Sequence, residues 1–259
     1  MSDGEIDAVE VHDHPGTVQV TINRAPVNAL SLALTRKLRD FFLSVDERYP
    51  DARCIVLTGA GKMFCAGADV KELSERTTGS MLARSAVTRA TFDAIRRCPI
   101  PVIAAVNGPA IGAGVVVASC CDIILASETA TFSLPEILVG VMGGTRHTAR
   151  LVPEKVVRYL ALTGRRVDAY YLQRFGGVHE VTAPDDLMPV ALTLAGDMAK
   201  NSPSAVRLMK EAINLTEDMP LNEGYRVEQL FTTLASSMPD SKEAAVAFLE
   251  KRKPIWNKG

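Results

Sequence analysis

Apolar and polar residues alternate between residues 18 and 22, where every second residue is valine or isoleucine. This period of two predicts a strand with one buried face. The pattern then changes to a helical period, with apolar residues three or four positions apart from residue 34 to residue 45. Ser31 stands where it can cap such a helix. We therefore expect a strand followed by a helix over residues 32–45.

Three later stretches are short and continuously apolar, at residues 54–58, 101–106 and 123–126. Such runs are typical of strands that are buried on both faces. Helical segments separate them, one over residues 71–97 and one after Gly114. Strands that alternate with helices indicate an α/β core in which much of the strand pairing is parallel or mixed.

The strand pattern stops in the C-terminal third of the chain, and helices are expected from there on. Ser202-Pro203 is typical of a helix start, with serine as the cap and proline in the first position. Residues 240–243 form a capping-box-like start for a last helix, which Pro254 ends. We therefore divide the chain into a core of residues 1–194 and a helical lid or oligomerisation region of residues 195–259.

Charge and apolar content argue against two kinds of partner. The chain carries 29 lysines and arginines against 30 aspartates and glutamates, and no run of one sign stands out. This balanced charge argues against a nucleic-acid-binding surface, because phosphate binding needs concentrated positive charge. No uninterrupted apolar run reaches the length of a bilayer-spanning helix. We expect a protein with no nucleic-acid partner and no membrane partner.

The N-terminal residues and the cysteines indicate a compartment. The N-terminal stretch is acidic and lacks the apolar centre of a signal peptide. The 5 cysteines contain no C-x-x-C pair and mostly lie in apolar segments, which favours reduced, buried thiols. We therefore expect a cytoplasmic protein. No set of histidine, cysteine and carboxylate residues at ligand spacing indicates a metal site.

Two glycine-containing turns, residues 64–69 and 107–114, each follow a predicted buried strand. Glycine lets the backbone turn sharply and lets a ligand approach the main chain. Two N–H groups that converge in such turns can stabilise an oxyanion, although glycine turns are also common structural joints. Neither turn matches the dinucleotide motif G-x-G-x-x-G or the phosphate loop G-x-x-x-x-G-K-[ST]. This disfavours a nucleotide-dependent oxidoreductase or a kinase.

The residues in and around these turns form an ordered series of motifs. Residues 64–72 read FCAGADVKE, and residues 101–114 read PVIAAVNGPAIGAG. Four shorter motifs follow: CDI at 121–123, FSLPEI at 132–137, GGT at 143–145 and LTGRR at 162–166. The series resembles the crotonase (enoyl-CoA hydratase/isomerase) superfamily from about residue 9 to the C-terminus. The corresponding family motifs are F-x-A-G-A-D-[ILV]-K-E, K-P-V-I-A-A-V-N-G-x-A-x-G-G-G, C-D-[IL], F-x-x-P-E-[IV], G-G-T and L-T-G-[RED]-R.

The resemblance implies an α/β fold with a crotonase-like spiral core of ββα units and a C-terminal helical region. It also implies assembly as a homotrimer or homohexamer. Two backbone N–H groups form the oxyanion hole of the family, and here they belong to Ala68 and Ala113. Most relatives have glycine at the second position, and alanine keeps the N–H. By the same resemblance, Glu136 is a catalytic carboxylate.

The resemblance further implies an acyl-CoA thioester substrate and no cofactor beyond its CoA moiety. Lys71 matches a family lysine that contacts CoA, and Ala66 matches a position whose carbonyl meets the adenine. Phe248 and Lys251 match positions that reach the CoA bound to a neighbouring subunit. The alternative for the two lysines is an ordinary solvated surface charge.

The chain departs from the hydratases of the family at Val116. Hydratases use two glutamates, and Val116 occupies the position of the first, which leaves Glu136 as the second. Valine cannot exchange a proton. Moving the double bond of a 3-enoyl thioester needs one base, which removes a proton from C2 and returns it at C4. Monofunctional isomerases of the superfamily share this combination, so we expect double-bond migration in an enoyl-CoA.

A second departure is the segment before Gly143, which is shorter than in most relatives and is expected to border the acyl pocket. His147 stands where the family usually has arginine. It is a candidate acid–base group, although the usual residues there serve packing. The alternatives to an isomerase are an enoyl-CoA hydratase, another acyl-CoA reaction such as decarboxylation or thioester hydrolysis, and a non-catalytic CoA-binding homologue.

Overall fold

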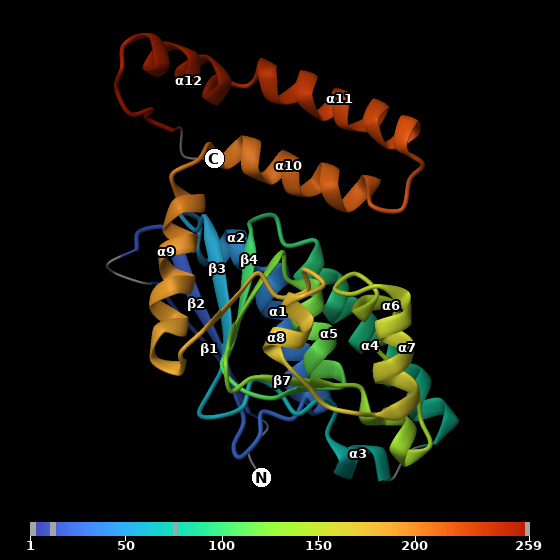
Figure 1. Cartoon of the computed structure of the whole chain (residues 1–259). Coiled ribbons are helices and arrows are strands. Elements are labelled where there is room, and N and C mark those ends of the chain that lie inside the picture. The colour runs from blue at the N-terminus through green and yellow to red at the C-terminus, as the bar shows by residue number, and fades with distance from the viewer. Residues whose placement is uncertain (1–3, 11–13, 75–76, 257–259) are drawn as a thin grey trace.

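The computed structural model describes residues 4–10, 14–74 and 77–256 (Figure 1). The larger sheet has the strand order β1 (Glu5–Glu10), β2 (Thr17–Asn23), β3 (Cys54–Gly59), β4 (Val102–Val106), β6 (Ile123–Ser127) and β9 (Glu180–Thr182). In this sheet β1 is antiparallel to β2, and the other neighbours are parallel. A smaller sheet has the order β5 (Ala110–Ile111), β7 (Thr131–Ser133) and β8 (Val167–Asp168).

Helices cover the larger sheet and form a separate layer near the C-terminus (Figure 1). The helices of the first half are α1 (Leu32–Leu43), α2 (Val45–Arg48), α3 (Val70–Ser74), α4 (Thr78–Arg96) and α5 (Ala113–Cys120). Those of the second half are η1 (Pro135–Val139), α6 (Thr145–Thr148), α7 (Glu154–Thr163), α8 (Ala169–Gln173), η2 (Pro184–Asp186), α9 (Leu187–Ala199), α10 (Pro203–Thr216), α11 (Leu221–Ser237) and α12 (Pro239–Leu249). Among the described residues, none of these helices combines the length and the apolar character that a bilayer crossing demands.

The central strands are buried on both faces, as their continuous apolar runs predict. Ile55 and Leu57 of β3 lie in the main core with the apolar residues of α1, α4 and α5. Cys54 and Val56 point to the opposite face of the sheet and pack against α9. Successive residues of a strand point to opposite sides, so a strand between two helical layers must be apolar throughout.

The first predicted helix is confirmed with its cap. The Leu34 N–H donates to the Ser31 hydroxyl (3.1 Å), and α1 follows directly after Ser31. The helical segment expected over residues 71–97 consists of α3 and α4, with residues 75 and 76 outside the described part. At the start of α10, the Ala205 N–H donates to the hydroxyl of Ser202 (3.1 Å), which confirms that cap as well.

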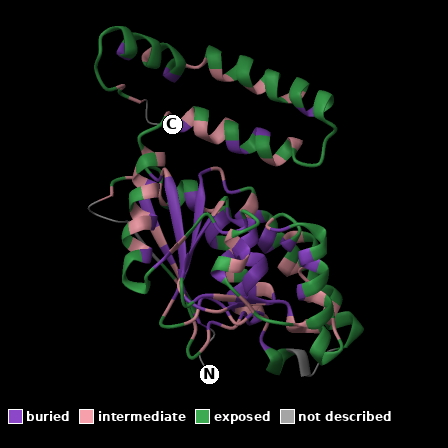
Figure 2. Cartoon of the chain, viewed as in Figure 1, coloured by how far each residue is buried: buried purple, intermediate pink, exposed green. Residues whose placement is uncertain are grey.

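The helical C-terminal layer begins later along the chain than expected. The boundary expected between residues 194 and 195 falls inside α9, which packs on the larger sheet through Leu187, Ala191 and Ala195. The separate layer is formed by α10, α11 and α12, residues 203–249, which we call the C-terminal arm (Figure 1). Figure 2 shows that α11 and α12 are exposed over most of their length.

The capping box expected at Asp240 is wrong. The last helix begins at Pro239, with Met238 as its N-cap, so that Asp240 lies within the first turn. The Asp240 carboxylate instead accepts hydrogen bonds from the hydroxyls of Ser202 (2.6 Å) and Ser204 (2.7 Å) at the start of α10. A contact between two helices of the arm thus uses the side chain that the local pattern assigned to capping.

An ion pair that involves a buried lysine ties the C-terminal arm to the core. On α10, the Lys210 ammonium lies 2.6 Å from an oxygen of Asp122, which precedes β6. Lys210 also donates to the Ile100 carbonyl (2.9 Å), and the same Asp122 oxygen accepts from the Val102 N–H (2.7 Å). These four groups join α10 to the first residues of two neighbouring core strands.

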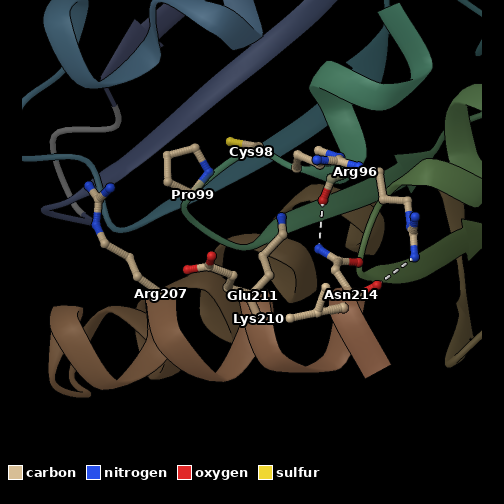
Figure 3. A pocket seen from close by; sticks show the side chains of 9 residues that line it. Arg96, Cys98, Pro99, Arg207, Lys210, Glu211 and Asn214 are labelled. Carbon is tan, nitrogen blue, oxygen red and sulfur yellow. Dashed lines mark hydrogen bonds between the residues drawn. The ribbon is translucent and has the colours of Figure 1, made fainter. Parts of the chain in front are cut away.

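Further polar groups line the contact between α10 and the core. A hollow of about 440 Å³ lies between α10 and the residues at the end of α4. Figure 3 shows the side chains of Arg207, Lys210, Glu211 and Asn214 on the α10 side of it. Four further ion pairs join the core to α10 or to the residues just after it: Arg207–Asp46, Arg96–Glu217, Arg150–Glu217 and Arg146–Asp218. Several ion pairs thus join the arm to the core.

Candidate active site

The first glycine turn carries the expected donor Ala68 and runs beside Leu30. Gly67 has a φ of +83°, a conformation that residues with a side chain rarely adopt. The Gly67 carbonyl accepts a hydrogen bond from the Leu30 N–H (2.7 Å), and the Asp69 N–H donates to the Leu30 carbonyl (3.1 Å). The C=O and N–H of a trans peptide point in opposite directions, so the Ala68 N–H points away from Leu30.

The second turn carries Ala113 as the first residue of α5. Its N-cap, Gly112, has a φ of +54°. The Gly112 N–H donates to the Ser133 carbonyl (2.9 Å) on β7, and the Gly112 carbonyl accepts from the Val115 N–H (2.9 Å). The Ala113 N–H is therefore one of the unpaired donors of a helix start, at the positive end of the helix dipole.

The two turns pack backbone against backbone. A Cβ added at Gly67 would lie 2.6 Å from the Ile111 carbonyl oxygen and 3.3 Å from the Ala113 nitrogen. The Ile111 N–H donates to the Cys65 carbonyl (2.9 Å) and holds the turns together. Within the described residues, neither Ala68 nor Ala113 donates its N–H to a protein acceptor. Two donors thus lie near one another, and both are available to a ligand.

Glu136 lies beside the second turn, at the start of η1 and directly after Pro135. A Cβ added at Gly112 would lie 2.6 Å from the Glu136 Oε1 atom, so the carboxylate occupies space that only glycine leaves free. Its Oε2 atom is buried and has no hydrogen-bond partner among the described residues. Burial raises the pKa of Glu136, and the hydrogen bond from its own backbone N–H offsets this only in part. A partly desolvated carboxyl of this kind is suited to proton transfer.

Val116 lies one helical turn after Gly112 and faces the same side of α5. It is 2% exposed. A Cβ added at Gly144, which follows the segment that is shorter than usual, would lie 3.0 Å from the Val116 Cγ2 atom. Hydratases of the family have their first glutamate at this position. Here the structure has the buried methyl groups of Val116, packed against Gly144.

His147 lies on α6 and packs against the C-terminal end of α5, apart from Glu136. Its Nδ1 atom is 3.5 Å from the Cys120 sulfur, and its ring packs edge-on against Phe92 with centroids 5.4 Å apart. Gly112 and Cys120 are eight residues apart along α5, or about 12 Å along a helix axis. Burial lowers the pKa of His147, and three nearby arginines lower it further: Arg150, Arg96 and Arg146. The structure does not bring His147 to the carboxylate.

A pocket of about 270 Å³ opens beside Ala68, between residues 24–29 and the start of α3. Ala66 and Lys71, the two expected CoA contacts from this part of the chain, line it together with Ala68. The Ala66 N–H donates to the carbonyl of Val27 across the pocket floor (3.1 Å). The structure thus places the expected CoA contacts next to the first N–H donor.

The comparisons with known proteins agree with these observations. The model of the enoyl-CoA hydratase/isomerase family matches residues 13–259. This chain belongs to that family. Its crotonase fold is shared with a solved enoyl-CoA hydratase from Bacillus anthracis, which is 33% identical with a TM-score of 0.91, over 100% of both chains.

Two relatives within the family carry different activities in their names. One is the (7aS)-7a-methyl-1,5-dioxo-2,3,5,6,7,7a-hexahydro-1H-indene-carboxyl-CoA hydrolase of Mycobacterium tuberculosis, 39% identical over 92% of this chain and 96% of that protein. The other is the short-chain-enoyl-CoA hydratase of Clostridium acetobutylicum, 35% identical over 96% of this chain and 97% of that protein. Family membership therefore makes the chain an acyl-CoA enzyme without selecting one reaction.

The two expected contacts from the last helix lie far from the pocket of the same chain. Phe248 is on α12 and is 83% exposed, and Lys251 follows that helix and is also exposed. Figure 1 shows α12 and α3 at opposite ends of the molecule. Because the structure contains one chain, the expected contact of Phe248 and Lys251 with the CoA of a neighbouring subunit stays a prediction.

Sequence reasoning missed an ion pair in the pocket of this family member. An Arg24 nitrogen lies 2.7 Å from an Asp69 oxygen, and each side chain is 11% exposed. Burial would raise the pKa of Asp69, but hydrogen bonds from Arg24 and from the Lys71 N–H hold it below its usual value. Asp69 lies within a recognised motif, whereas Arg24 is 45 residues away. No local pattern could have paired them.

Proposed function

We propose that this enzyme moves the double bond of an enoyl-CoA through an enolate, with Glu136 as its single base. One observation carries the proposal: a partly buried carboxyl of raised pKa lies beside two unpaired backbone N–H groups, with buried Val116 where a second carboxylate would stand. Proton abstraction next to a thioester needs these two devices, a base and a site that accepts negative charge.

The proposed substrate is a 3-enoyl-CoA thioester whose carbonyl oxygen accepts hydrogen bonds from the N–H groups of Ala68 and Ala113. Glu136 takes the proton from C2, and the electrons of that C–H bond move through the conjugated system to the thioester oxygen. The protonated Glu136 then gives the proton to C4, which re-forms the carbonyl and yields 2-enoyl-CoA. Atoms and electrons balance without an oxidant or a metal, so the CoA moiety of the substrate is the only cofactor group required.

The oxyanion hole and the general base each lower the barrier to proton abstraction from C2. Each preorganised donor in an oxyanion hole contributes about 3 kcal/mol to the transition state. A positioned general base contributes roughly 10²- to 10⁴-fold in rate. Because Glu136 is desolvated, it is also a stronger base toward carbon than an exposed glutamate.

Val116 disfavours hydration of the double bond. Adding water across a 2-enoyl-CoA requires one group to orient and deprotonate the water and another to protonate carbon, and a valine does neither. Its methyl groups also leave water without a hydrogen-bond partner on that wall of the site. Proton return by the same carboxyl is then favoured over attack by water.

We place the CoA moiety in the 270 Å³ pocket, with the Ala66 carbonyl and the Lys71 ammonium as its contacts. In the assembly that we propose, a homotrimer or homohexamer, Phe248 and Lys251 of one subunit reach the CoA of the next. The exposed position of both residues supports such a contact. The five free cysteines are all buried, which fits a protein of the cytoplasm.

A hydrolase acting on an acyl-CoA is the second candidate, favoured by the 39% identity to a carboxyl-CoA hydrolase. In that case Glu136 would deprotonate water rather than carbon, and the oxyanion hole would hold the tetrahedral intermediate. Buried Val116 stands where a second carboxylate could have positioned the water. A hydratase has the same difficulty.

Product analysis separates these reactions. Purified enzyme is incubated in parallel with 3-enoyl-CoA and 2-enoyl-CoA, and products are identified by mass and by release of free CoA thiol. The proposal expects conversion of 3-enoyl-CoA to an isomer of equal mass, with little hydration of 2-enoyl-CoA. A product heavier by one water, or free CoA, would instead establish the hydratase or the hydrolase.

The variant Val116→Glu tests why hydration is weak. It restores the second carboxylate, and we expect hydration of 2-enoyl-CoA to rise while stability falls by about 1–3 kcal/mol, the scale of a buried polar group without a partner. Val116→Met is the control, because it adds similar volume without charge. Hydration that rises equally in both variants would contradict the proposed role of Val116.

A further inference from the structure

The Arg24–Asp69 ion pair lies across the contact that orients the first N–H donor. Leu30 and Ala68 form an isolated parallel bridge. Arg24 donates one hydrogen bond to the Ala29 carbonyl (2.9 Å) and another to the Asp69 carboxylate (2.7 Å). It therefore joins the residue that precedes Leu30 to the residue that follows Ala68.

The direction of the Ala68 N–H depends on this bridge. The Gly67–Ala68 peptide is held at its carbonyl end by the Leu30 N–H (2.7 Å), and the next peptide is held by the Asp69 N–H on the Leu30 carbonyl (3.1 Å). The N–H end of the Gly67–Ala68 peptide has no protein acceptor within the described residues. Since a peptide group is rigid, the atoms around Leu30 and Asp69 determine where this free N–H points.

Asp69 also links the bridge to the CoA pocket. Its second carboxylate oxygen accepts from the Lys71 N–H at the start of α3 (2.9 Å). Arg24, Asp69 and Lys71 all line the 270 Å³ pocket. The ion pair is thus shared between the wall that we assign to CoA and the turn that we assign to the thioester oxygen.

We propose that Arg24 and Asp69 are positioning residues, which clamp the Leu30–Ala68 bridge and so aim the Ala68 N–H at the thioester carbonyl. The inference rests on the proposed function, because it assumes that Ala68 is an oxyanion donor. Neither side chain touches the reacting atoms. Loss of the clamp weakens a hydrogen bond to the transition state, so it lowers kcat more than it raises KM.

An ion pair suits this task because both partners are largely removed from water. Removing one partner leaves a buried charge without compensation, and the turn must move to solvate it. A displacement of about 1 Å in a catalytic group costs roughly 10²-fold in rate. Loss of the clamp can therefore have a large effect on catalysis in addition to its cost in stability.

The test measures hydrogen bonding to the thioester oxygen separately from turnover. A saturated acyl-CoA such as butyryl-CoA, carrying ¹³C at the thioester carbonyl, has no double bond to move. Its carbonyl chemical shift, free and bound, reports hydrogen bonding to that oxygen. The shift is measured with wild type, Asp69→Asn, Arg24→Gln and the double variant, beside kcat and KM with the reactive substrate.

The matched control is Asp122→Asn. Asp122, like Asp69, accepts from one cation and one backbone N–H, but it lies at the opposite end of the strands. Its loss should lower stability and leave the bound carbonyl shift unchanged. The control therefore shows whether a loss of stability far from the glycine turns can change the carbonyl shift.

The clamp predicts a smaller bound carbonyl shift in each single variant, with kcat lower by about 10- to 100-fold and KM within about threefold of wild type. The double variant should be no worse than the singles, because both remove the same interaction. Asp69→Glu, which keeps the charge but displaces it by one methylene, should also reduce the shift and serves if Asp69→Asn does not fold.

Three results would overturn the clamp. One is an unchanged carbonyl shift in folded Asp69→Asn or Asp69→Glu. Another is independent, additive effects of the two substitutions. The third is a raised KM with an unchanged shift in Arg24→Gln alone, which would make Arg24 a CoA ligand instead. Failure of the proposed reaction looks different, because wild type would then give a hydrated product or free CoA instead of an isomer. If Ala68 were not an oxyanion donor at all, wild type itself would show no shift of the carbonyl on binding.

Discussion

At the scale of single residues, the site combines a buried carboxylate oxygen, unpaired among the described residues, with a glycine of positive φ packed against it. Glu136 has a buried carboxylate oxygen without a partner within the described residues, although buried polar atoms are nearly always hydrogen-bonded. Gly112 combines a φ of +54° with direct packing against that carboxylate. Unsatisfied and strained groups of this kind cluster at functional sites, where reactivity outweighs stability.

The raised pKa of Glu136 predicts that Glu136→Gln is more stable than wild type at neutral pH. A carboxyl whose folded-state pKa is raised is disfavoured in its ionised form by folding, so wild type loses stability as pH rises through that pKa. Below the ordinary glutamate value of 4.5 the carboxyl is protonated in both states, and the difference should vanish. Melting temperatures across this pH range check the sign.

Activity should follow the opposite protonation state, because the base must be ionised. Turnover should therefore fall as pH decreases through a pKa above 4.5, and Glu136→Gln should retain acyl-CoA binding but lose proton exchange at C2. Deuterium incorporation measured by NMR reports this step. Persistent exchange in Glu136→Gln would assign the base to another group.

Gly112→Ala should disturb the catalytic carboxylate as well as the backbone. The added Cβ would lie 2.6 Å from the Glu136 Oε1 atom at a positive φ, so we expect a loss of about 1–3 kcal/mol in stability and most of the activity. Gly176→Ala is the matched control, since Gly176 has a φ of +77° with nothing within 4 Å. It should show the backbone cost in chemical denaturation while turnover stays normal.

At the scale of elements, α9 and α10 contact the core through different kinds of side chain. α9 packs on the sheet through apolar residues, whereas α10 meets the core through ion pairs and a hollow of about 440 Å³. Charged contacts with the core reach the α10–α11 junction at Glu217 and Asp218. The C-terminal arm is thus held to the core by interactions that are individually strong only where they are buried.

Asp122→Asn should release the arm more than it disturbs the core. Lys210 is 8% exposed, so removing the opposite charge leaves a buried ammonium and should cost about 2–4 kcal/mol. Hydrogen exchange should increase first in α10, with the central strands still protected. Arg146→Gln is the control, because its pair with Asp218 is exposed on both sides and should contribute less than about 1 kcal/mol. Equal exchange increases throughout the chain in Asp122→Asn would contradict local release.

At the scale of the whole molecule, the C-terminal arm exposes apolar side chains that a monomer has no means to cover. Leu221, Leu230, Phe248 and Leu249 are all largely exposed. Extended exposed apolar surface often marks a contact with another chain, and the closed symmetric assembly that we propose would cover it.

Sedimentation should therefore give a trimer or a hexamer at micromolar concentration. Leu230→Lys places a charge on the arm and should shift the population toward smaller species. Leu43→Lys is the control, because Leu43 is equally exposed but lies on α1 of the core. A wild-type monomer would remove the support for CoA contacts from Phe248 and Lys251 of a neighbour.

Much of the fold and part of the candidate site could be predicted before the structure. The continuous apolar runs predicted the central strands, and Ser31 and Ser202 predicted the starts of two helices, because these signals depend only on residues within one turn. The ordered motifs identified the family, and with it the two glycine turns, since those turns need glycine for local backbone reasons.

The remainder depends on which distant segments meet, and this only the tertiary structure decided. Asp240 was assigned to a cap but pairs with Ser202 and Ser204, since contacts between helices can override a local preference. His147 could have been an acid–base group until α5 placed it about two turns from Gly112. The Arg24–Asp69 pair joins residues 45 positions apart, and no periodicity or motif carries information over that distance. The sequence by itself determined where the chain turns, because φ and ψ are local; which charges meet at those turns was decided by packing.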